Sequence, residues 1–427
     1  MLVTPTQFNS STSQPYTQQV QIRRSAIAGQ QLHPQVQQAR QINASGRFST
    51  FNSLQGIRFG SSTIPSSQDS HAKDETHRVL NWLKTMVEKG LKIKFVFDYD
   101  GTMIPLRKDL KSKRERLQQP EYAQYIKDHK IDIKNDWHVH ICDPPALASE
   151  VKILEQLAHH PMVKGVSFAT ARAADQIIRY FPQLQGSPVH IISGLMAEHY
   201  DFKENKKTKF LDSKYHDAIT KLIENLKQDP AKSGLPFKIE PQPTVQNQDF
   251  YRLILPPGTQ GEAYLEIKPY AICLHRKDLM NQISPHARAI ADSLPALKQW
   301  MHKYQDATFK VVHSGPTAQE LELFPDLENF DKGLTVPFLQ KISGYHQDYA
   351  MMTMGDSIGD EEAPKTDGQL FKATHHHFPE KSATVWVNGN GDKKTSFVNF
   401  RVLTPKQIYH LLAEFLKQHP ADRAAQV

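Results

Sequence analysis

A short apolar run in this chain stops abruptly at two acidic residues. Residues Ile93 to Phe97 are apolar except for Lys94, and they lead directly into the pentapeptide D-Y-D-G-T, Asp98 to Thr102. A β-branched and aromatic run of this length, ending in acidic residues and glycine, is typical of a buried strand that stops at a loop. The two carboxylates are two positions apart, so an extended backbone points them the same way. The run therefore predicts a sheet whose edge carries two like charges close together.

Phosphate chemistry would make use of such a pair. Like charges at this separation cost free energy unless a cation or a phosphate group uses them. The arrangement suits Asp98 as a nucleophile that forms an aspartyl-phosphate, and Asp100 as the acid and base. Both residues would help to hold Mg²⁺ through oxygen ligands, and Gly101 and Thr102 would offer backbone N–H groups to phosphate oxygens. The alternative is a plain acidic turn after a strand, but the pentapeptide favours a catalytic role for the two acids.

A second apolar run also ends at a residue suited to phosphate. Residues 163–170 have the pattern of a strand, and Thr170-Ala171-Arg172 opens a helical pattern from 173 to 180. A hydroxyl at a strand end and helix N-terminus can bind phosphate. Taken alone, Thr170 is more simply explained as an ordinary helix N-cap.

Two more segments follow the same plan further along the chain. Lys332 precedes a helical pattern from 334 to 342, where it would either neutralise a phosphate or lie on the surface. Residues 351–354 form an apolar run that ends in a Gly-rich loop with Asp356 and Asp360 four positions apart. Two acids in such a loop suit a magnesium site, although a solvated acidic loop would have the same sequence. The four segments in order make phosphate chemistry the favoured interpretation.

The alternation of patterns predicts the architecture. Strand and helix patterns alternate from 93 to 200 and again from about 308, which predicts an α/β fold with a doubly wound parallel sheet. Between them lie a helical pattern at 212–227, two strand-like runs and a second helical pattern near 285–304. This change predicts a small α+β module inserted into the sheet domain. We therefore expect a core made of residues 76–201 and 306–427, with an inserted module at 202–305.

Two segments stand apart from these units. Residues 1–75 are rich in Gln, Ser and Thr, which predicts a disordered tail. The first 68 residues have five arginines and no acidic residue, a composition that overlaps with organelle transit peptides. We favour a plain extension and a cytoplasmic protein, with organelle targeting as the alternative. Residues 107–143 form a basic, polar insertion; we favour a solvated helical insertion over a lid that attracts an anionic substrate.

Composition argues against several classes of protein. The net charge is +7, but the acid-free tail contributes most of it, so the charge is a weak argument for nucleic-acid binding. No apolar run approaches the roughly 20 residues that a membrane helix needs. The two cysteines, Cys142 and Cys273, have neither a disulfide framework nor a metal-ligand spacing. We expect a small-molecule partner, no membrane and no nucleic acid, while the oligomeric state stays open.

The four segments resemble, in order, the motifs of haloacid-dehalogenase-type (HAD) phosphatases. Other stretches make the resemblance more specific, to trehalose-6-phosphate phosphatases, whose cap is of the C2 type. The stretches that carry it, within residues 90–415, are Gly194 to His199, Glu266 to Lys268 with Leu274 to Arg276, Glu322 to Pro325, Gly355 to Glu361, and Val385 to Gly389.

The resemblance implies a HAD-like core with an inserted cap and an enzyme that hydrolyses trehalose 6-phosphate with Mg²⁺. The residues that it implies fall into three groups. The catalytic group is Asp98, Asp100, Thr170 and Lys332; the metal group is Asp98, Asp100, Asp356 and Asp360; and the substrate group is Arg172, Glu198, His199, Glu266, Lys268 and Glu322.

The chain departs from the family's pattern in four places. Thr170-Ala171-Arg172 replaces S-G-R, Tyr200 replaces a glycine, Phe324 replaces an arginine, and Ser357 replaces the second acid of G-D-D. The catalytic acids and the lysine remain, so we expect phosphatase chemistry. The alternatives are a HAD phosphatase for another sugar phosphate, of the sucrose-phosphate or glycosyl-phosphoglycerate type, or a HAD-derived binding protein without turnover.

Overall fold

The structure is a computed structural model, and it describes residues 67–421 with several gaps. The gaps are at residues 106–108, 143, 229–237, 243–249, 255–261, 277–298, 300–301, 304–306, 315–319, 328–330, 345–347, 359–365, 388–396 and 403. The tail at 1–66 and most of the helix expected near 285–304 therefore lie outside the described residues.

A large sheet of eight strands forms the first layer of the fold. Its strand order is β14-β13-β12-β1-β2-β3-β4-β5, parallel from β14 to β3 and antiparallel in the last two pairs. The strands are β1 (Lys92–Phe97), β2 (Val163–Ala169), β3 (Val189–Ser193), β4 (Glu198–Asp201), β5 (Lys206–Lys209), β12 (Tyr349–Gly355), β13 (Ser382–Val387) and β14 (Phe400–Val402). β1 lies between β12 and β2, so both of its edges are paired.

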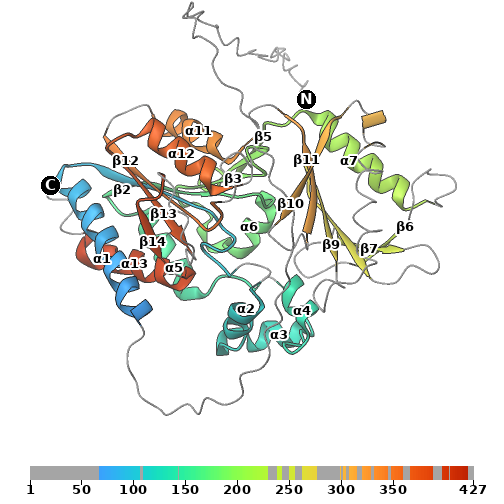
Figure 1. Cartoon of the computed structure of the whole chain (residues 1–427), viewed down its shortest axis with the longest axis horizontal. Helices are drawn as coiled ribbons and strands as arrows, with labels where there is room; N and C mark the ends of the chain where they lie inside the picture. The colour runs from blue at the N-terminus through green and yellow to red at the C-terminus, as the bar shows by residue number, and fades with distance from the viewer. Residues whose placement is uncertain are drawn as a thin grey trace, which may run out of the picture. The chain divides into compact units, whose positions relative to one another are not determined.

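Helices cover both faces of this sheet (Figure 1). Side chains alternate along β1: Phe95 and Phe97 pack in one core cluster, while Val96 packs in another. The first cluster includes side chains of α1 (Ser67–Glu88), α5 (Ala148–Ala158), α6 (Ala174–Tyr180) and α13 (Pro405–Gln418). The second includes side chains of α11 (Thr335–Ser343) and α12 (Asp367–His377). The expected α/β class, a doubly wound and mainly parallel sheet, is confirmed.

A second sheet of six antiparallel strands has the order β10-β11-β9-β8-β7-β6. Its strands are β6 (Lys238–Pro241), β7 (Phe250–Ile254), β8 (Ala263–Ile267), β9 (Ile272–Arg276), β10 (Phe309–Ser314) and β11 (Glu320–Pro325). Leu265, Leu274 and Leu323 of this sheet pack with Ala218 and Leu222 of α7 (Ser213–Leu226). One face of the second sheet is thus buried under α7.

The sheets divide the chain differently from our expectation of an inserted module at 202–305. β5, at Lys206–Lys209, pairs in the large sheet, whereas β10 and β11 pair in the second sheet. A local strand pattern such as that of β10 does not tell which sheet the strand joins. Leu323 opposite Ile272 joins β11 to β9, so the sheet membership places the inserted module at about 213–325.

The insertion at 107–143 is folded into helices. They are α2 (Leu110–Leu117), α3 (Ala123–Asp128) and α4 (Asp136–Ile141), with the short 3₁₀ turn η1 (Pro120–Tyr122). Leu117, Val139 and Cys142 form a small apolar centre within it. The insertion is therefore helical, as favoured, and it has its own apolar centre.

The N-terminal boundary of the folded part lies before residue 75. α1 begins at Ser67, and the backbone N–H of Arg401 donates to Glu75 Oε2 at 3.2 Å. Glu75 is 6% exposed. Our expected tail of 1–75 therefore includes the first turns of α1, whereas the disorder of residues 1–66 stays a prediction. In the described part of the chain, no helix has both the length and the apolar character needed to span a membrane.

Truncations should locate this boundary. Deleting residues 1–66 should leave the midpoint of thermal unfolding within a degree or two. Deleting residues 1–75 should lower it by several degrees, because it leaves the Arg401 N–H without its carboxylate, a loss of about 1–3 kcal/mol. Equal midpoints for the two truncated proteins would contradict the assigned role of Glu75.

Lys94 in β1 is a buried lysine whose effect on stability can be measured as a function of pH. The residue is 1% exposed, and its ammonium donates to Ser343 Oγ at 2.8 Å. Burial, with the positive charge of Lys164, lowers the pKa of Lys94 from 10.5 to about 8. The unfolded chain therefore binds more protons than the folded one between pH 8 and 10.5, so stability should rise with pH across this window.

Substituting Lys94 should remove this pH dependence. Lys94→Met should raise the free energy of unfolding at pH 7 by about 3 kcal/mol, because no charge then has to be buried. The gain over wild type should shrink above pH 8 and vanish above pH 10.5. Denaturant unfolding at pH 7 and at pH 10.5 measures both values, and a destabilised Lys94→Met protein at pH 7 would contradict the account.

Candidate active site

Three neighbouring strands of the large sheet end at the same edge with polar residues. Phe97 lies opposite Met354 of β12 and opposite Phe168 of β2. Asp98, Asp356 and Thr170 follow these strand ends by one or two positions. Parallel strands of an open α/β sheet place their carboxyl ends together, and sites form there. The sequence-predicted residues Asp98, Thr170 and Asp356 thus lie at one edge.

Asp98 lies in a cluster of three carboxylates, of which two are buried and Asp356 is half-buried. One oxygen each of Asp98, Asp356 and Asp367 can be chosen so that all lie within 4.8 Å of one another. Lys332, the first residue of the 3₁₀ turn η4 (Lys332–Leu334), donates from Nζ to Asp98 Oδ1 at 2.6 Å and to Asp367 Oδ1 at 2.6 Å. Both carboxylates and the ammonium are buried.

The protonation of this cluster reflects burial and crowding. Burial, followed by the charge of Asp367, raises the pKa of Asp98 to about 7, against the opposing effect of Lys332. Burial and the charge of Asp98 raise the pKa of Asp356 well above its ordinary value. Burial acts to lower the pKa of Lys332, but the charges of Asp367 and Asp98 outweigh this effect, so the pKa is raised above its ordinary value. The three carboxylates share one ammonium, and their oxygen donors fit a hard cation such as Mg²⁺.

Asp367 was not among the residues predicted from the sequence. It opens α12, and its side chain fills the space beside Gly355, where a Cβ would lie 2.2 Å from Asp367 Cγ. The backbone N–H of Ser357 donates to its Oδ2 at 2.9 Å. The predicted residue Asp360 lies outside the described residues. The sequence does carry Asp367 at the start of a further helical pattern, but residues 356–366 separate it from the strand end at Gly355.

Asp100 is held by Arg172. Its two oxygens accept from Arg172 Nε at 2.7 Å and Nη2 at 2.6 Å. The Thr170 hydroxyl accepts from the backbone N–H of Arg172 at 3.1 Å, whereas the N-cap of α6 is Ala173. Thr170 is therefore not the helix cap that the sequence allowed. The guanidinium also lies over the ring of Tyr180, with its carbon 5.8 Å from the ring centroid.

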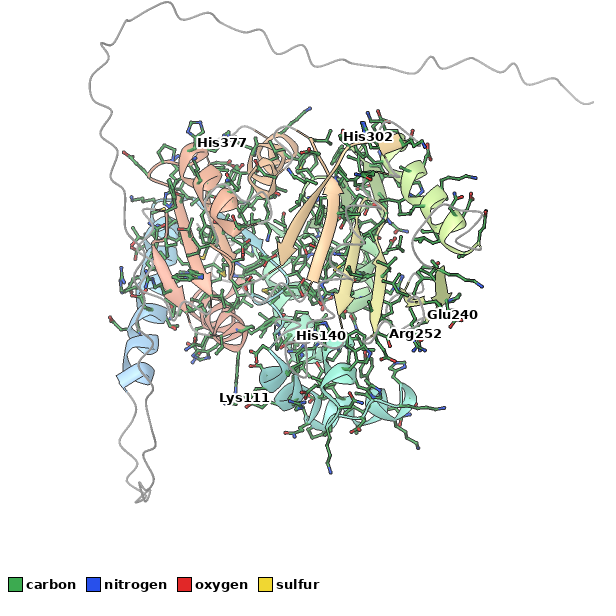
Figure 2. The ribbon with its side chains drawn as sticks, turned by 45° about the vertical axis from the view of Figure 1, so that its right-hand side comes forward. Lys111, His140, Glu240, Arg252, His302 and His377 are labelled. Carbon is green, nitrogen blue, oxygen red and sulfur yellow. The ribbon has the colours of Figure 1, made fainter. Side chains whose placement is uncertain are left out.

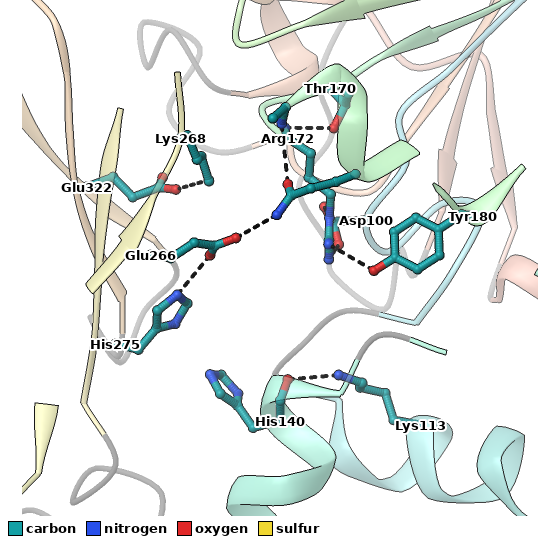
Figure 3. Close-up of polar contacts among 12 residues, drawn as sticks. Asp100, Lys113, His140, Thr170, Arg172, Tyr180, Glu266, Lys268, His275 and Glu322 are labelled. Carbon is teal, nitrogen blue, oxygen red and sulfur yellow. Dashed lines mark hydrogen bonds and ion pairs between the residues drawn. The ribbon is translucent and has the colours of Figure 1, made fainter. Parts of the chain in front are cut away.

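The polar face of the second sheet carries three of the predicted substrate residues. Glu266 lies opposite Cys273, and Cys273 lies opposite Glu322, so these side chains share the face that α7 leaves open. Lys268 Nζ donates to Glu322 Oε1 at 2.8 Å. Glu266 accepts at Oε1 from Gln176 Nε2 of α6 at 2.7 Å, and its Oε2 lies 2.9 Å from His275 Nε2. Figure 3 shows these contacts beside the Arg172–Asp100 pair.

The remaining two predicted substrate residues lie on opposite faces of β4. Glu198 is buried and accepts from Ser193 Oγ at 3.2 Å, and its Oε1 has no hydrogen-bond partner among the described residues. The ring of His199 contacts Phe338 of α11, with 5.0 Å between ring centroids, and its Nε2 lies 3.1 Å from His190 Nδ1. Successive side chains of a strand alternate, so the structure does not bring His199 together with Glu198.

Two of the departures from the family pattern have clear positions. The Tyr200 hydroxyl bonds to Gln185 and Asn205, within the core of the large sheet. Phe324 is fully buried and stacks on Tyr270, with ring centroids 6.3 Å apart.

Tyr270 joins the two sheets. It lies in the turn between β8 and β9, and its hydroxyl donates to the Ala171 carbonyl at 2.9 Å. Gly194 has φ +58°, and a Cβ there would lie 2.3 Å from the Tyr270 ring, so glycine is required for this contact. Tyr270 therefore docks the second sheet on the loops that follow β2 and β3.

Comparisons with known proteins were made for the whole chain. No protein-family model and no curated protein matches it. Similar solved structures include the C-terminal domain of trehalose-6-phosphate phosphatase from Candida albicans, with 14% identity, coverage of 80% of this chain and 96% of that chain, and a TM-score of 0.46. Trehalose-6-phosphate phosphatase from Aspergillus fumigatus has 14% identity, coverage of 79% and 97%, and a TM-score of 0.42.

A haloacid dehalogenase-like hydrolase from Bacteroides thetaiotaomicron is also similar, with 13% identity, coverage of 76% of this chain and 99% of that chain, and a TM-score of 0.38. The chain thus resembles both trehalose-6-phosphate phosphatases and HAD-like hydrolases.

Proposed function

We propose that this protein is a Mg²⁺-dependent phosphatase that hydrolyses trehalose 6-phosphate through an aspartyl-phosphate. The observation that carries the proposal is the position of Asp98. It is a buried carboxylate at the end of a central parallel strand, held by Lys332 and crowded by two further carboxylates. A carboxylate that is desolvated and oriented in this way suits a nucleophile for phosphoryl transfer.

Asp98, Asp356 and the backbone carbonyl of Asp100 would hold Mg²⁺ at this edge. When bound, the ion would neutralise charge and orient the phosphate. We keep Asp360 as a candidate for the ion's water shell. Asp367 holds Lys332 together with Asp98, so the ammonium is positioned to meet phosphate oxygens.

The reaction would divide between the two acids of the pentapeptide. Asp98 would attack the phosphorus, and Asp100 would protonate the leaving oxygen and then accept a proton from water. Thr170 and Lys332 would bind the equatorial oxygens. Both oxygens of Asp100 now face the Arg172 guanidinium. The acid role therefore requires one of these two hydrogen bonds to open, so that an oxygen can reach the leaving group.

The polar face of the second sheet would bind the sugar. Glu198, Glu266, Lys268 and Glu322 are all buried polar groups. Carboxylates suit sugar hydroxyls because each offers several lone pairs to donors, so Glu266 can accept further hydrogen bonds beside those from Gln176 and His275. We propose residues 213–325 as a cap that closes over the sugar.

A substrate panel tests the proposed specificity. With Mg²⁺ present, phosphate release should be fastest from trehalose 6-phosphate among trehalose, sucrose and glucose 6-phosphates. Glu266→Ala and Lys268→Ala should lower kcat/KM for the disaccharide by about 100-fold, because a site built for hydroxyls loses discrimination when its polar groups go. The same substitutions should lower kcat/KM for p-nitrophenyl phosphate only a few-fold.

The matched control for this panel is Glu240→Ala. Glu240 is an exposed acid on β6 (Figure 2), and its substitution should change neither activity. If phosphate release from another sugar phosphate were ten times faster, that ester would replace trehalose 6-phosphate as the proposed substrate. No release from any ester, by a protein that remains folded, would favour a binding protein without turnover.

A further inference from the structure

The helical insertion is fixed to the core at its base. Arg116 donates to both oxygens of Glu150 on α5, at 2.8 and 2.5 Å, and both residues are buried. The Tyr122 hydroxyl donates to the Pro145 carbonyl at 2.6 Å. A two-point guanidinium–carboxylate contact restricts geometry as well as distance. The insertion therefore has a defined position on the core domain.

α4 of the insertion contacts the second sheet. The ring of Trp137 stacks on Tyr264, with centroids 4.7 Å apart and planes at 30°, and Tyr264 stacks on Phe250 with centroids 5.5 Å apart. The three side chains form a buried cluster of their own. Stacked rings at these separations are favourable contacts beyond the area that they bury. α4 thus bridges the core domain and the inserted module.

His140 continues this contact toward Glu266. Its ring lies edge-on to the ring of His275, with centroids 5.8 Å apart, and stacks on Trp137 at 5.5 Å. His275 in turn contacts one oxygen of Glu266, while Gln176 of the core donates to the other. Figure 3 shows His140 below His275 on the side away from Glu266. Glu266 is therefore fixed from two directions.

Two basic residues of the insertion are engaged within its own structure. Lys113 Nζ donates to the His140 carbonyl at 2.9 Å. Arg114 pairs with Asp136 and donates from Nε to the Ile133 carbonyl at 2.9 Å. Lys113 and Arg114 thus help to orient α4, while Arg116 fixes the insertion to α5.

We propose that α4 is a specificity element, in which Trp137 and His140 position His275 and so hold Glu266 where substrate hydroxyls bind. This inference rests on the proposed function, because Glu266 is a substrate residue only if a hydroxyl-bearing phosphate ester is the substrate. Trp137 and His140 are positioning residues, since they act through His275. A displacement of about 1 Å in a binding group is enough to lower the rate of a well-aligned reaction considerably.

The test uses the full-length protein and the sugar phosphate that wild type hydrolyses best. Trp137→Ala should lower kcat/KM for that ester at least tenfold, mainly through KM, and lower it less than twofold for p-nitrophenyl phosphate. Trp137→Phe keeps an aromatic ring against Tyr264 and should recover most of the loss. His140→Gln should give the same split as Trp137→Ala. His138→Gln, the same change two residues away on α4, is the control, because His138 contacts the Asp132 backbone instead.

Amide hydrogen exchange provides a readout that does not depend on turnover. Exchange of residues 263–276 should be faster in Trp137→Ala than in wild type and unchanged in His138→Gln. Faster exchange with equal losses on both esters would mean a purely structural contact and would overturn the proposal, as would an unchanged preference for the sugar phosphate. A wild type that releases no phosphate from any sugar phosphate would instead remove the proposed function.

Discussion

Asp98→Asn should abolish phosphate release, lowering kcat by about four orders of magnitude or more. An amide cannot accept a phosphoryl group, and it also removes the carboxylate that Lys332 contacts at 2.6 Å. Phosphate release in the presence of Mg²⁺ measures the loss, both on trehalose 6-phosphate and on p-nitrophenyl phosphate. Both activities should disappear together, because the nucleophile is common to every substrate.

Asp348→Asn is the matched control for Asp98→Asn. Asp348 is an exposed acid just before β12, at the end of the sheet opposite Asp98, and it contacts Lys164 on the surface. Its substitution should leave kcat within twofold of wild type. Turnover at more than a hundredth of the wild-type rate by a folded Asp98→Asn protein would rule out the nucleophile.

Asp367→Asn should lower kcat/KM about 100- to 1,000-fold, the range seen when one preorganised charge-stabilising group is lost. Asp367 is a second carboxylate partner of Lys332, beside Asp98. Without its charge the ammonium would pair with Asp98 alone, which would draw it away from the phosphate and hold back the nucleophile. The amide has nearly the same size as the carboxylate, so the space beside Gly355 stays filled.

Asp360→Asn is the comparison variant that tells whether Asp367 or Asp360 is the functional acid. Sequence spacing selects Asp360 as the second acid of the loop, whereas the contact with Lys332 selects Asp367. Asp360→Asn should therefore cost less than tenfold when assayed beside Asp367→Asn under the same Mg²⁺ concentration. If Asp360→Asn lowered kcat/KM more than Asp367→Asn, Asp360 would be the functional acid of this segment, and Asp367 would have only a structural role.

Apolar runs made the sheet and most of its polar edge predictable. β1, β2 and β12 are mainly apolar because helices cover both faces of the sheet, and each stops at a residue that was then identified, Asp98, Thr170 or Asp356. These residues belong to short local patterns in which strand and loop are adjacent. Asp367 was missed because residues 356–366 separate it from β12, and the local pattern at a strand end does not extend that far.

Contacts between distant segments were the other part that the sequence did not reveal. β10 and β11 have ordinary strand patterns, and their membership in the second sheet depends on pairing with β9. Trp137 and His140 looked like residues of a polar insertion, because their partners Tyr264 and His275 are more than 120 positions away in the sequence. Pairing and stacking between such segments follow from tertiary packing, which no local pattern records.

The central place of β1 also has a consequence for the order of folding. β1 pairs on one side with β12, Lys92 opposite Tyr349, and the whole second sheet lies between these strands in the chain. Contacts of such high sequence separation form slowly, because a long loop must close first. During synthesis, the second sheet is complete before β12 leaves the ribosome, so it can fold first. Until then β1 has an open edge with unpaired backbone groups, which makes that stage prone to aggregation.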